Sequence, residues 1–413
     1  MRKLNLILFN SSLSSHDNCL NIHRELLGKI QALYDVRLIW HEDLADSDYS
    51  DAPTMLFIGS GGVEELVKAS RKSLPSYLLM IADGLCNSLA ASLEILSWIR
   101  LEGGSGRVLH GTDDFILQGI SDFTIASAAL GKLQGKRLGV IGKPSGWLIA
   151  SGVDYSAVKQ RWGVEIADLP LDEVIARYEK ISNAMVEDET SRFVARATVM
   201  REPTRAEMIK AARLYLAVKG MVNEYQLDAF TLNCFDLIPP SRTTGCLALA
   251  LLNEEGVPAG CEGDLQTILT MMAVSAVTGE PSFMANPSKI LNNATHEIIL
   301  AHCTIAPSMT RQFEIRTHFE SQSGVAIDGI LEPGDMTIVK CGGHNMERFF
   351  ITGGQLLENL HHENMCRTQL HLRLEKSLDY FLERSIGNHH VIVPGNHLPA
   401  LTSLFRLLGA QEV

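Results

Sequence analysis

The acidic residues best placed for chemistry lie in the short segment 261–264, which reads Cys-Glu-Gly-Asp between apolar residues. The segment directly precedes a predicted helix over residues 265–277. A helix N-terminus favours carboxylates, and an aspartate there is a natural N-cap, so both a catalytic role and a capping role are open for Asp264. Glu262 precedes the cap, where a carboxylate needs a cation to offset its desolvation. We therefore predict that Glu262 is a metal ligand or a catalytic residue.

Histidines provide a second set of candidate ligands. His302 lies in a predicted apolar strand over residues 298–304, and His389 and His390 begin another strand near the C-terminus. Successive side chains of a strand point to opposite faces, so only one of this pair is expected to reach a shared site. A lone histidine in an apolar strand is also typical of a hydrogen-bonded core residue. Glutamate and histidine together suit Mn, Fe, Co or Zn better than Ca.

Three further residues lie in turns that follow predicted strands of the N-terminal region. They are Gly61, Asn87 and Ser88. Parallel sheets bind ligands at the carboxyl ends of their strands, which makes these residues candidates for substrate binding. Ordinary turn chemistry or helix capping explains the same residues without a ligand. The glycine spacing around Gly61 fits neither a dinucleotide fingerprint nor a P-loop.

Nucleophilic catalysis has no recognisable signature in this sequence. No Gly-x-Ser-x-Gly elbow occurs. The cysteines are widely spaced and form no Cys-x-x-Cys pair, at positions 19, 86, 234, 246, 261, 303, 341 and 366. In a chain of this length they indicate buried thiols of a reducing compartment, not a disulfide framework or a zinc site.

The elements that must position these residues indicate an α/β fold in three parts. Short apolar strands alternate with helices through residues 1–120 and again through 121–280, which predicts two parallel-sheet α/β domains, the second carrying the Glu-Gly-Asp motif. Residues 189–218 are predicted as one long charged helix. From about residue 282, short strands follow one another between Gly, Pro and polar turns. Residues 281–413 are therefore predicted to form a C-terminal, mostly antiparallel, barrel-like domain.

Charge and hydropathy narrow the class of protein. The net charge of −12 and the absence of a Lys/Arg run argue against a nucleic-acid partner. No stretch approaches the roughly 20 apolar residues of a membrane span. The apolar N-terminal run ends at Asn10 and is too short for a signal peptide, so a first β-strand explains it better. We expect a cytoplasmic protein without a membrane or nucleic-acid partner.

These motifs together resemble the L-fucose isomerase-related family, which includes the arabinose isomerases. The most specific part of the resemblance is the Glu-Gly-Asp motif, its helix and the His302-Cys303 pair. The similar segments are residues 59–64, 87–91, 142–148, 261–264, 269–271, 283–287, 301–303 and 389–397. The resemblance implies two α/β domains, a barrel-like C-terminal domain and a homo-oligomer, trimer or hexamer, with sites near subunit interfaces. It also implies aldose–ketose interconversion through a cis-enediol stabilised by a divalent metal, usually Mn²⁺.

Carried over by position, the resemblance assigns ligands and substrate contacts. Glu262 is expected to be both a metal ligand and a proton-transfer carboxylate, and His302 a ligand. The last imidazole is expected from His390, with His389 facing the sugar. Trp147, like the residues of the N-terminal turns, is expected to contact the substrate, although a core role explains it equally well.

Asn286 departs from the family pattern, because the family has its second carboxylate in the segment 283–287. An amide oxygen can bind a metal, but it cannot abstract a proton. Asp264 or Asp236 is a candidate replacement. Three hypotheses follow: a metal-dependent aldose–ketose isomerase, a metal-dependent lyase or epimerase acting on a sugar, and a catalytically silent sugar-binding relative.

Overall fold

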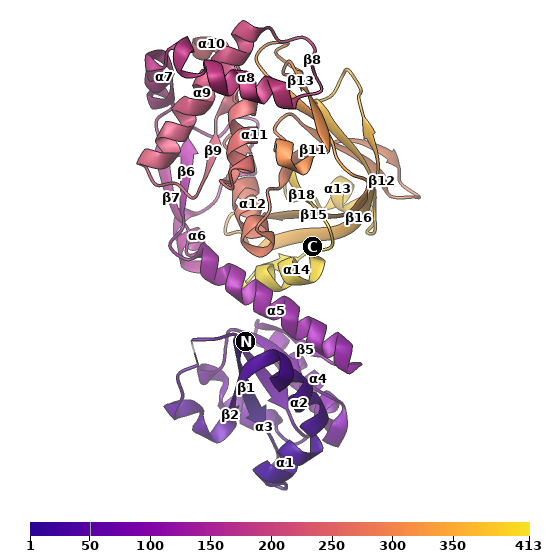
Figure 1. Cartoon of the computed structure of the whole chain (residues 1–413). Helices are drawn as coiled ribbons and strands as arrows, with labels where there is room; N and C mark the ends of the chain where they lie inside the picture. The colour runs from indigo at the N-terminus through magenta and orange to yellow at the C-terminus, as the bar shows by residue number, and fades with distance from the viewer. Residues whose placement is uncertain (50) are drawn as a thin grey trace. The chain divides into compact units, whose positions relative to one another are not determined.

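The computed structural model describes residues 1–49 and 51–413, which divide into two compact units. Unit 1 comprises Met1–Ala129 with Thr402–Gly409, and unit 2 comprises Leu130–Leu401 with Ala410–Val413 (Figure 1). The predicted domain boundary after residue 120 falls inside helix α5, Asp113–Leu133. The predicted boundary after residue 280 stays a prediction.

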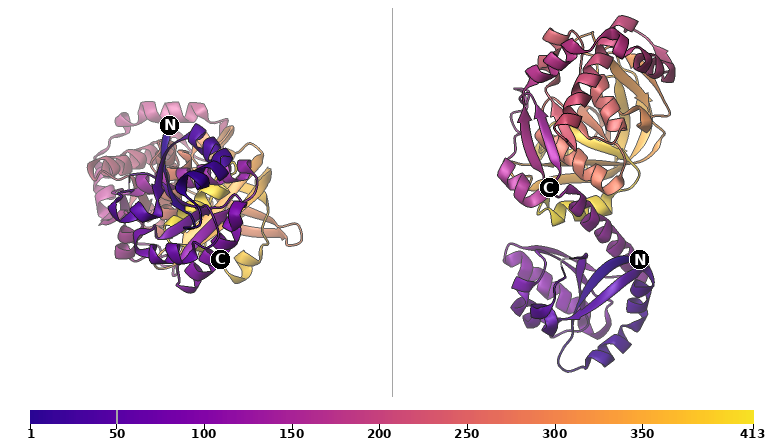
Figure 2. Two further views of the ribbon diagram at one scale, coloured as in Figure 1. Left: turned by 90° about the horizontal axis from the view of Figure 1, so that it is seen from below. Right: turned by 60° about the vertical axis from the view of Figure 1, so that its left-hand side comes forward.

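Unit 1 is built on a parallel sheet with strand order β2-β1-β3-β4-β5. Its strands are β1 (Arg2–Phe9), β2 (Tyr34–Trp40), β3 (Thr54–Ile58), β4 (Tyr77–Ile81) and β5 (Ser105–Leu109). Alternate residues of β1 enter two separate cores, Leu6 in one and Ile7 in the other. Helices α2 (Arg24–Leu33) and α5 cover the first core, and α3 (Glu64–Ala69) and α4 (Ser88–Leu101) cover the second (Figure 2). The sheet with helices on both faces confirms the predicted α/β architecture.

Helical spacing of apolar residues runs through 18–33 in the sequence, but the structure interrupts it. Helix α1 (His16–Ile22) ends and α2 begins at His23, whose ring is buried. Nδ1 of His23 lies 2.5 Å from the carboxylate of Asp83, and Nε2 lies 2.8 Å from the carbonyl oxygen of Gly59. These two contacts tie the junction between the helices to the ends of β3 and β4.

Unit 2 contains a second parallel sheet, with strand order β10-β9-β6-β7. Its strands are β6 (Arg137–Ile141), β7 (Glu165–Leu169), β9 (Ala229–Leu232) and β10 (Ala259–Cys261). The helices of this part are α6 (Tyr155–Trp162), α7 (Leu171–Lys180), α8 (Glu187–Arg196), α9 (Arg205–Glu224), α10 (Cys234–Ser241), α11 (Cys246–Glu254) and α12 (Leu265–Thr278). The single long helix predicted over residues 189–218 is wrong, because β8 (Val199–Met200) and Pro203 separate α8 from α9.

The C-terminal strands form a closed antiparallel barrel, as predicted. The strand order is β15-β18-β11-β12-β17-β16, and pairing of β15 with β16 closes the ring. The strands are β11 (Phe283–Asn292), β12 (Glu297–His302), β15 (Gly334–Gly342), β16 (Arg348–Leu360), β17 (Thr368–Leu374) and β18 (His390–Pro394). Strands β13 (Gln312–Arg316) and β14 (Ala326–Ile330) form a separate small sheet with β8, in the order β14-β13-β8. Strand β19 (Gln411–Glu412) pairs with β16 in parallel. The last helices are α13 (Asp379–Glu383) and α14 (Leu398–Leu407).

Helix α12 joins the second parallel sheet to the barrel. It is apolar on all sides, and its first ten residues, from Leu265 to Val274, are buried. It packs against β9 and β10 of the sheet and against β15 and β18 of the barrel (Figure 1). Its N-terminus therefore lies where residues from both parts of unit 2 meet. Among residues 1–49 and 51–413, no helix has the length and apolar character needed to cross a membrane.

Candidate functional site

Glu262 lies in the tight turn that connects β10 to α12. Its backbone has φ of +64°, a left-handed conformation that is uncommon for a residue with a side chain, and Gly263 follows with φ of +74°. A Cβ atom on Gly263 would lie 2.6 Å from Cα of Pro144, so the turn requires glycine there. The carbonyl oxygen of Glu262 accepts a hydrogen bond from the backbone N–H of Ser145 at 2.8 Å. The loop after β6 thus holds the turn in place.

The carboxylate of Glu262 is mostly buried and faces two polar side chains. Oε2 accepts a hydrogen bond from the indole Nε1–H of Trp147 at 2.6 Å, and Oε1 lies 3.5 Å from Nε2 of His389. Burial raises the pKa of Glu262, but His389, Trp147 and the nearby His302 outweigh it and hold the pKa below its usual range. Glu262 is therefore an anion at neutral pH.

Two neighbouring side chains bring further ligand atoms to Glu262. The Sγ atom of Cys261, a carboxylate oxygen of Glu262 and a ring nitrogen of His302 lie within 4.8 Å of one another, and all three residues are buried. His302 is the last residue of β12, and the Thr304 hydroxyl lies 3.0 Å from its Nδ1. Burial lowers the pKa of His302 to about 3, so its imidazole is neutral, the form that binds metals.

His389 completes this group from the residue just before β18. Its Nδ1 lies 2.9 Å from the carboxylate of Asp264, and its ring meets that of His302 edge to face at 5.5 Å. Its Nε2 is buried, points towards Glu262 and has no hydrogen-bond partner in the part of the chain that the structure describes. Burial lowers the pKa of His389, but the two carboxylates outweigh it and raise the pKa above its usual range.

Asp264 is fully buried at the N-cap of α12, so the predicted capping role is confirmed. It accepts hydrogen bonds from the backbone N–H and the hydroxyl of Thr267, and Nζ of Lys340 lies 3.8 Å from Oδ2. Burial raises the pKa of Asp264, but Lys340 and His389 outweigh it and lower the pKa well below its usual range. Asp264 orients His389, and a direct catalytic role for it stays a prediction.

The structure does not bring His390 to Glu262, although the sequence analysis preferred it over His389 as the last ligand. Its Nε2 lies 3.0 Å from the hydroxyl of Tyr380, and its Nδ1 lies 2.9 Å from the carbonyl oxygen of Asn388. The ring is buried among aromatic side chains that include Phe350 and Phe381, and burial lowers its pKa to about 3. The pair points to opposite faces of the strand as predicted, with His389 on the face of Glu262.

Cys261, Glu262 and His302 line a cavity of about 50 Å³ in unit 2. Asn286 of β11 lines it, and its Oδ1 accepts a hydrogen bond from Asn388 at 2.8 Å. The cavity is lined by Cys234, Phe235, Ile238, Thr244, Cys246, Cys261, Glu262, Asn286, His302, Cys303, His318, Glu320 and Cys366. The indole of Trp147 packs edge to face on Phe235 at 4.9 Å, which places Trp147 beside the same cavity.

Two further residues of the cavity, His318 and Glu320, can exchange protons and were not predicted from the sequence. Both follow β13, and Glu320 is an exposed carboxylate. A histidine and a glutamate two residues apart just after a predicted strand are a signal that could have identified them. Asp236, proposed as a replacement carboxylate, instead accepts a hydrogen bond from the side-chain amide of Asn233 near the start of α10, and its backbone N–H donates to Oδ1 of Asn233.

The three N-terminal candidates lie together in unit 1, around the start of α4. The N–H of Gly61 donates to the carbonyl oxygen of Cys86 at 2.7 Å, and Asn87 has φ of +62°. The hydroxyl of Ser88 accepts from the N–H of Gly84 at 3.1 Å. These contacts explain the local turn, and sugar binding by these residues stays a prediction.

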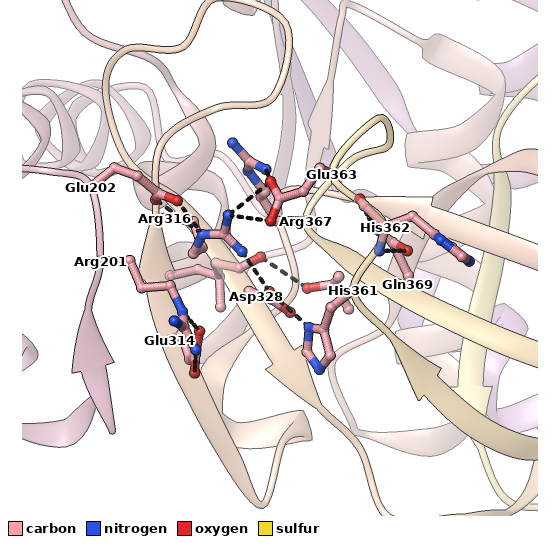
Figure 3. Close-up of polar contacts among 12 residues, drawn as sticks. Arg201, Glu202, Glu314, Arg316, Asp328, His361, His362, Glu363, Arg367 and Gln369 are labelled. Atoms are coloured by element: carbon pink, nitrogen blue, oxygen red, sulfur yellow. Dashed lines mark hydrogen bonds and ion pairs between the residues drawn. The ribbon is translucent and has the colours of Figure 1, made fainter.

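A second polar cluster lies at the small β8-β13-β14 sheet (Figure 3). The buried guanidinium of Arg316 pairs with Glu202 at 2.7 Å, with Glu363 at 3.3 Å and with the buried Asp328 at 3.4 Å. The cluster borders a cavity of about 410 Å³. Arg367 is buried as well and also pairs with Glu363 at 3.4 Å, so the carboxylates of this cluster are held in structural ion pairs.

Parts of the chain are similar to known sugar isomerases. The family described as L-arabinose isomerase central domain matches residues 150–280, the segment that contains Glu262 and α12. An L-arabinose isomerase of Acidothermus cellulolyticus is 26% identical over 211 residues, which are 49% of this chain and 42% of that protein. A sulfoquinovose isomerase of a Clostridium species is 23% identical over 312 residues, 71% of this chain and 69% of that protein.

The matches support the arabinose isomerase part of the resemblance found in the sequence. The chain spans less than half of the arabinose isomerase that it matches. The fucose isomerase side of the expected resemblance stays a prediction. The family match and the two relatives support an arabinose isomerase-like family for this chain.

Proposed function

We propose that this chain is a metal-dependent sugar isomerase that interconverts an aldose and a ketose. The observation that carries the proposal is that Glu262 and His302 line one cavity, while the ring of His389 packs on His302 and directs its buried Nε2 at Glu262. The names of the two relatives, an L-arabinose isomerase and a sulfoquinovose isomerase, support the reaction class. Mn²⁺ and a homo-oligomer remain predictions.

The residues present fit a divalent cation. Glu262 is anionic, His302 is neutral, and Nε2 of His389 is buried and directed at Glu262. Because the two carboxylates favour the protonated form of His389, its Nε2 would give up its proton on binding a cation. Asp264 fixes the ring of His389 through Nδ1, the arrangement in which a carboxylate orients a metal-binding histidine. Glu262, His302 and His389 would hold the cation. When bound, the cation would polarise the sugar oxygens as a Lewis acid.

The chain must also move protons. Isomerisation removes the proton from C2 of the aldose, passes through a cis-enediol and returns a proton to C1, while the hydroxyl proton moves from O2 to O1. Glu262 and Glu320 both line the cavity, so two carboxylates are available to remove and return these protons. Glu320 supplies the carboxylate that Asn286 lacks.

Metal content and isomerase activity test the proposal together. Wild-type protein expressed with Mn²⁺, Co²⁺ or Zn²⁺ is expected to hold stoichiometric metal and to isomerise a sugar from a panel of pentoses, 6-deoxyhexoses and sulfoquinovose. Glu262→Gln is expected to lose both properties, and Glu332→Gln, a matched change of an exposed carboxylate outside the cavity, is expected to keep both.

The alternative functions predict different results. A wild type that takes up no metal contradicts the isomerase proposal and favours the silent sugar-binding relative. Metal binding with cleavage or epimerisation of the sugars, and no isomerisation, favours the lyase or epimerase.

A further inference from the structure

Thiols gather around the cavity that contains Glu262. Cys234, Cys246, Cys261, Cys303 and Cys366 all line it, which is five of the eight cysteines in the sequence. They come from segments between residues 234 and 366 that meet only in the folded chain. Cysteine is therefore the most frequent residue type among those that line the cavity.

Cys261 forms a compact group with two of the proposed ligands. Its Sγ lies within 4.8 Å of a ligand atom of both Glu262 and His302, and its side chain is 4% exposed. As the last residue of β10, it is held in register with Leu232 of β9. It also begins the turn that carries Glu262, so strand pairing fixes the sulfur relative to the carboxylate.

A second thiol contacts Cys261. The thiol of Cys234 donates to the carbonyl oxygen of Leu232 at 3.3 Å, and the two sulfur atoms of Cys234 and Cys261 lie 2.7 Å apart. Either thiol can donate in the contact between them. Metal binding would displace the proton of Cys261, because the thiolate is the form that coordinates metals.

We propose that Cys261 is a sulfur ligand of the metal and that it shifts the preference of the site from Mn²⁺ towards Zn²⁺ and Co²⁺. Thiolates select such borderline metals, whereas Mn²⁺ prefers oxygen ligands. With Glu262, His302 and His389, Cys261 completes a set of one oxygen, two nitrogen and one sulfur ligand, all of which zinc accepts in proteins. One thiolate and one carboxylate also neutralise the charge of a divalent cation. This inference rests on the proposed function, because it concerns the same metal.

Cobalt absorption tests the sulfur ligand directly. Reduced, oxygen-free protein titrated with Co²⁺ is expected to develop a near-ultraviolet sulfur-to-cobalt charge-transfer band. Cys261→Ser is expected to bind Co²⁺ without that band, and the matched variants Cys234→Ser and Cys303→Ser are expected to keep it. A band that persists in Cys261→Ser, or that disappears only in Cys234→Ser, overturns the assignment.

Metal competition tests the selectivity. All sites of this kind favour Zn²⁺ over Mn²⁺ to some degree, so the informative quantity is the change in the ratio of the two affinities between wild type and variant. We expect Cys261→Ser to lower the Zn²⁺/Mn²⁺ affinity ratio. An unchanged ratio contradicts the proposal. Circular dichroism of each variant establishes that it is folded.

A wild-type measurement avoids variants altogether. X-ray absorption at the zinc edge of the loaded protein is expected to show a sulfur neighbour at about 2.3 Å. A zinc shell of nitrogen and oxygen alone overturns the sulfur ligand but leaves the isomerase proposal intact if the sugars are still converted. A wild type that binds no metal overturns both.

Discussion

At the scale of single residues, the environment of Glu262 explains why its carboxylate stays charged although it is buried. Trp147 provides a neutral donor from a side chain that is 56% exposed, whereas His389 provides a buried imidazole held by Asp264. The two contacts reach different oxygens of the same carboxylate. Their contributions to activity can therefore be separated by substitution.

We predict that Trp147→Phe impairs catalysis more than stability. The phenyl ring can keep the contact with Phe235, but it lacks the N–H that Glu262 accepts at 2.6 Å. Loss of a hydrogen bond to a charged group costs about 1.5 kcal/mol or more, so kcat/KM should fall roughly tenfold. Because Trp147 is mostly exposed, the unfolding midpoint should barely move. Unchanged steady-state kinetics would show that the indole N–H does not support Glu262 during turnover.

Glu320 gives the sharper test of proton transfer. If it acts as the second carboxylate, Glu320→Gln should lower kcat by roughly 10²–10⁴, the usual contribution of a general acid or base. Metal content should be unchanged, in contrast to Glu262→Gln. The variant Glu332→Gln is again the control. A Glu320→Gln enzyme with wild-type kcat would return the role of second base to another group.

At the scale of elements, the break between α8 and α9 has an identifiable cause. Thr204 and Glu207 form a capping box at the start of α9, in which each side chain bonds to the backbone N–H of the other residue. We predict that Thr204→Ala lowers the free energy of unfolding by about 1 kcal/mol. Urea denaturation of the two proteins measures the difference. Thr204→Ser, which keeps the hydroxyl, should stay close to wild type.

Regular hydrophobic patterns made most helices and strands predictable from the sequence. Local interruptions of these elements were not predictable. The apolar runs of β1, β6 and β9 gave strands close to their observed bounds. The junction at His23 was missed because helical spacing continues through it, and its cause is a pair of contacts to β3 and β4 that lie far along the chain. Strand β16 runs from Arg348 to Leu360 and is longer than the short strands expected in this region, since it pairs with both β15 and β17.

The candidate site was predictable only in part, because contacts between distant segments of the chain determine which residues meet. Glu262 and His302 stand out in the sequence because each is polar in an apolar segment. Which histidine of the pair faces Glu262 depends on the orientation of β18, and no local pattern gives that orientation. Cys261 becomes a candidate only when the fold brings β10 and the end of β12 to one cavity.

At the scale of the whole molecule, the two compact units are expected to differ in how metal changes their thermal stability. Each unit has its own sheet and its own buried residues, so we expect calorimetry to resolve two transitions. Metal at about 100 times its dissociation constant should stabilise unit 2 by about 2.7 kcal/mol and leave unit 1 unchanged. Glu262→Gln should abolish the shift. A metal-induced shift in both transitions, or in neither, would contradict this assignment.

Unit 1 should instead give the protein a pH-dependent stability. Both ring nitrogens of His23 face acceptors, Asp83 and the carbonyl oxygen of Gly59, so the ring is a doubly protonated cation. Burial lowers the pKa of His23, but Asp83 and the other acceptors outweigh it and raise the pKa from 6.5 to about 10. This stabilisation is fully present below about pH 6.5 and is lost as the pH rises towards 10.

Substitution of His23 tests this source of pH dependence. Removing one partner of a buried ion pair costs about 3–5 kcal/mol, so His23→Gln should destabilise the protein by that order near pH 6. The difference from wild type should shrink as the pH approaches 10. Unfolding measured from pH 6 to 10 follows both proteins. A difference that stays constant over this range would assign the loss to packing instead of charge.

The left-handed backbone of Glu262 has a consequence for how this protein balances durability against activity. At most positions alanine is at least as stabilising as glycine, because glycine has more conformational freedom to lose. With φ of +64° the order should reverse, and Glu262→Gly should be more stable than Glu262→Ala by about 1–2 kcal/mol. Selection for thermal robustness alone would therefore favour glycine at this turn. A glutamate there is a compromise in which the fold tolerates local strain to keep a carboxylate in the cavity.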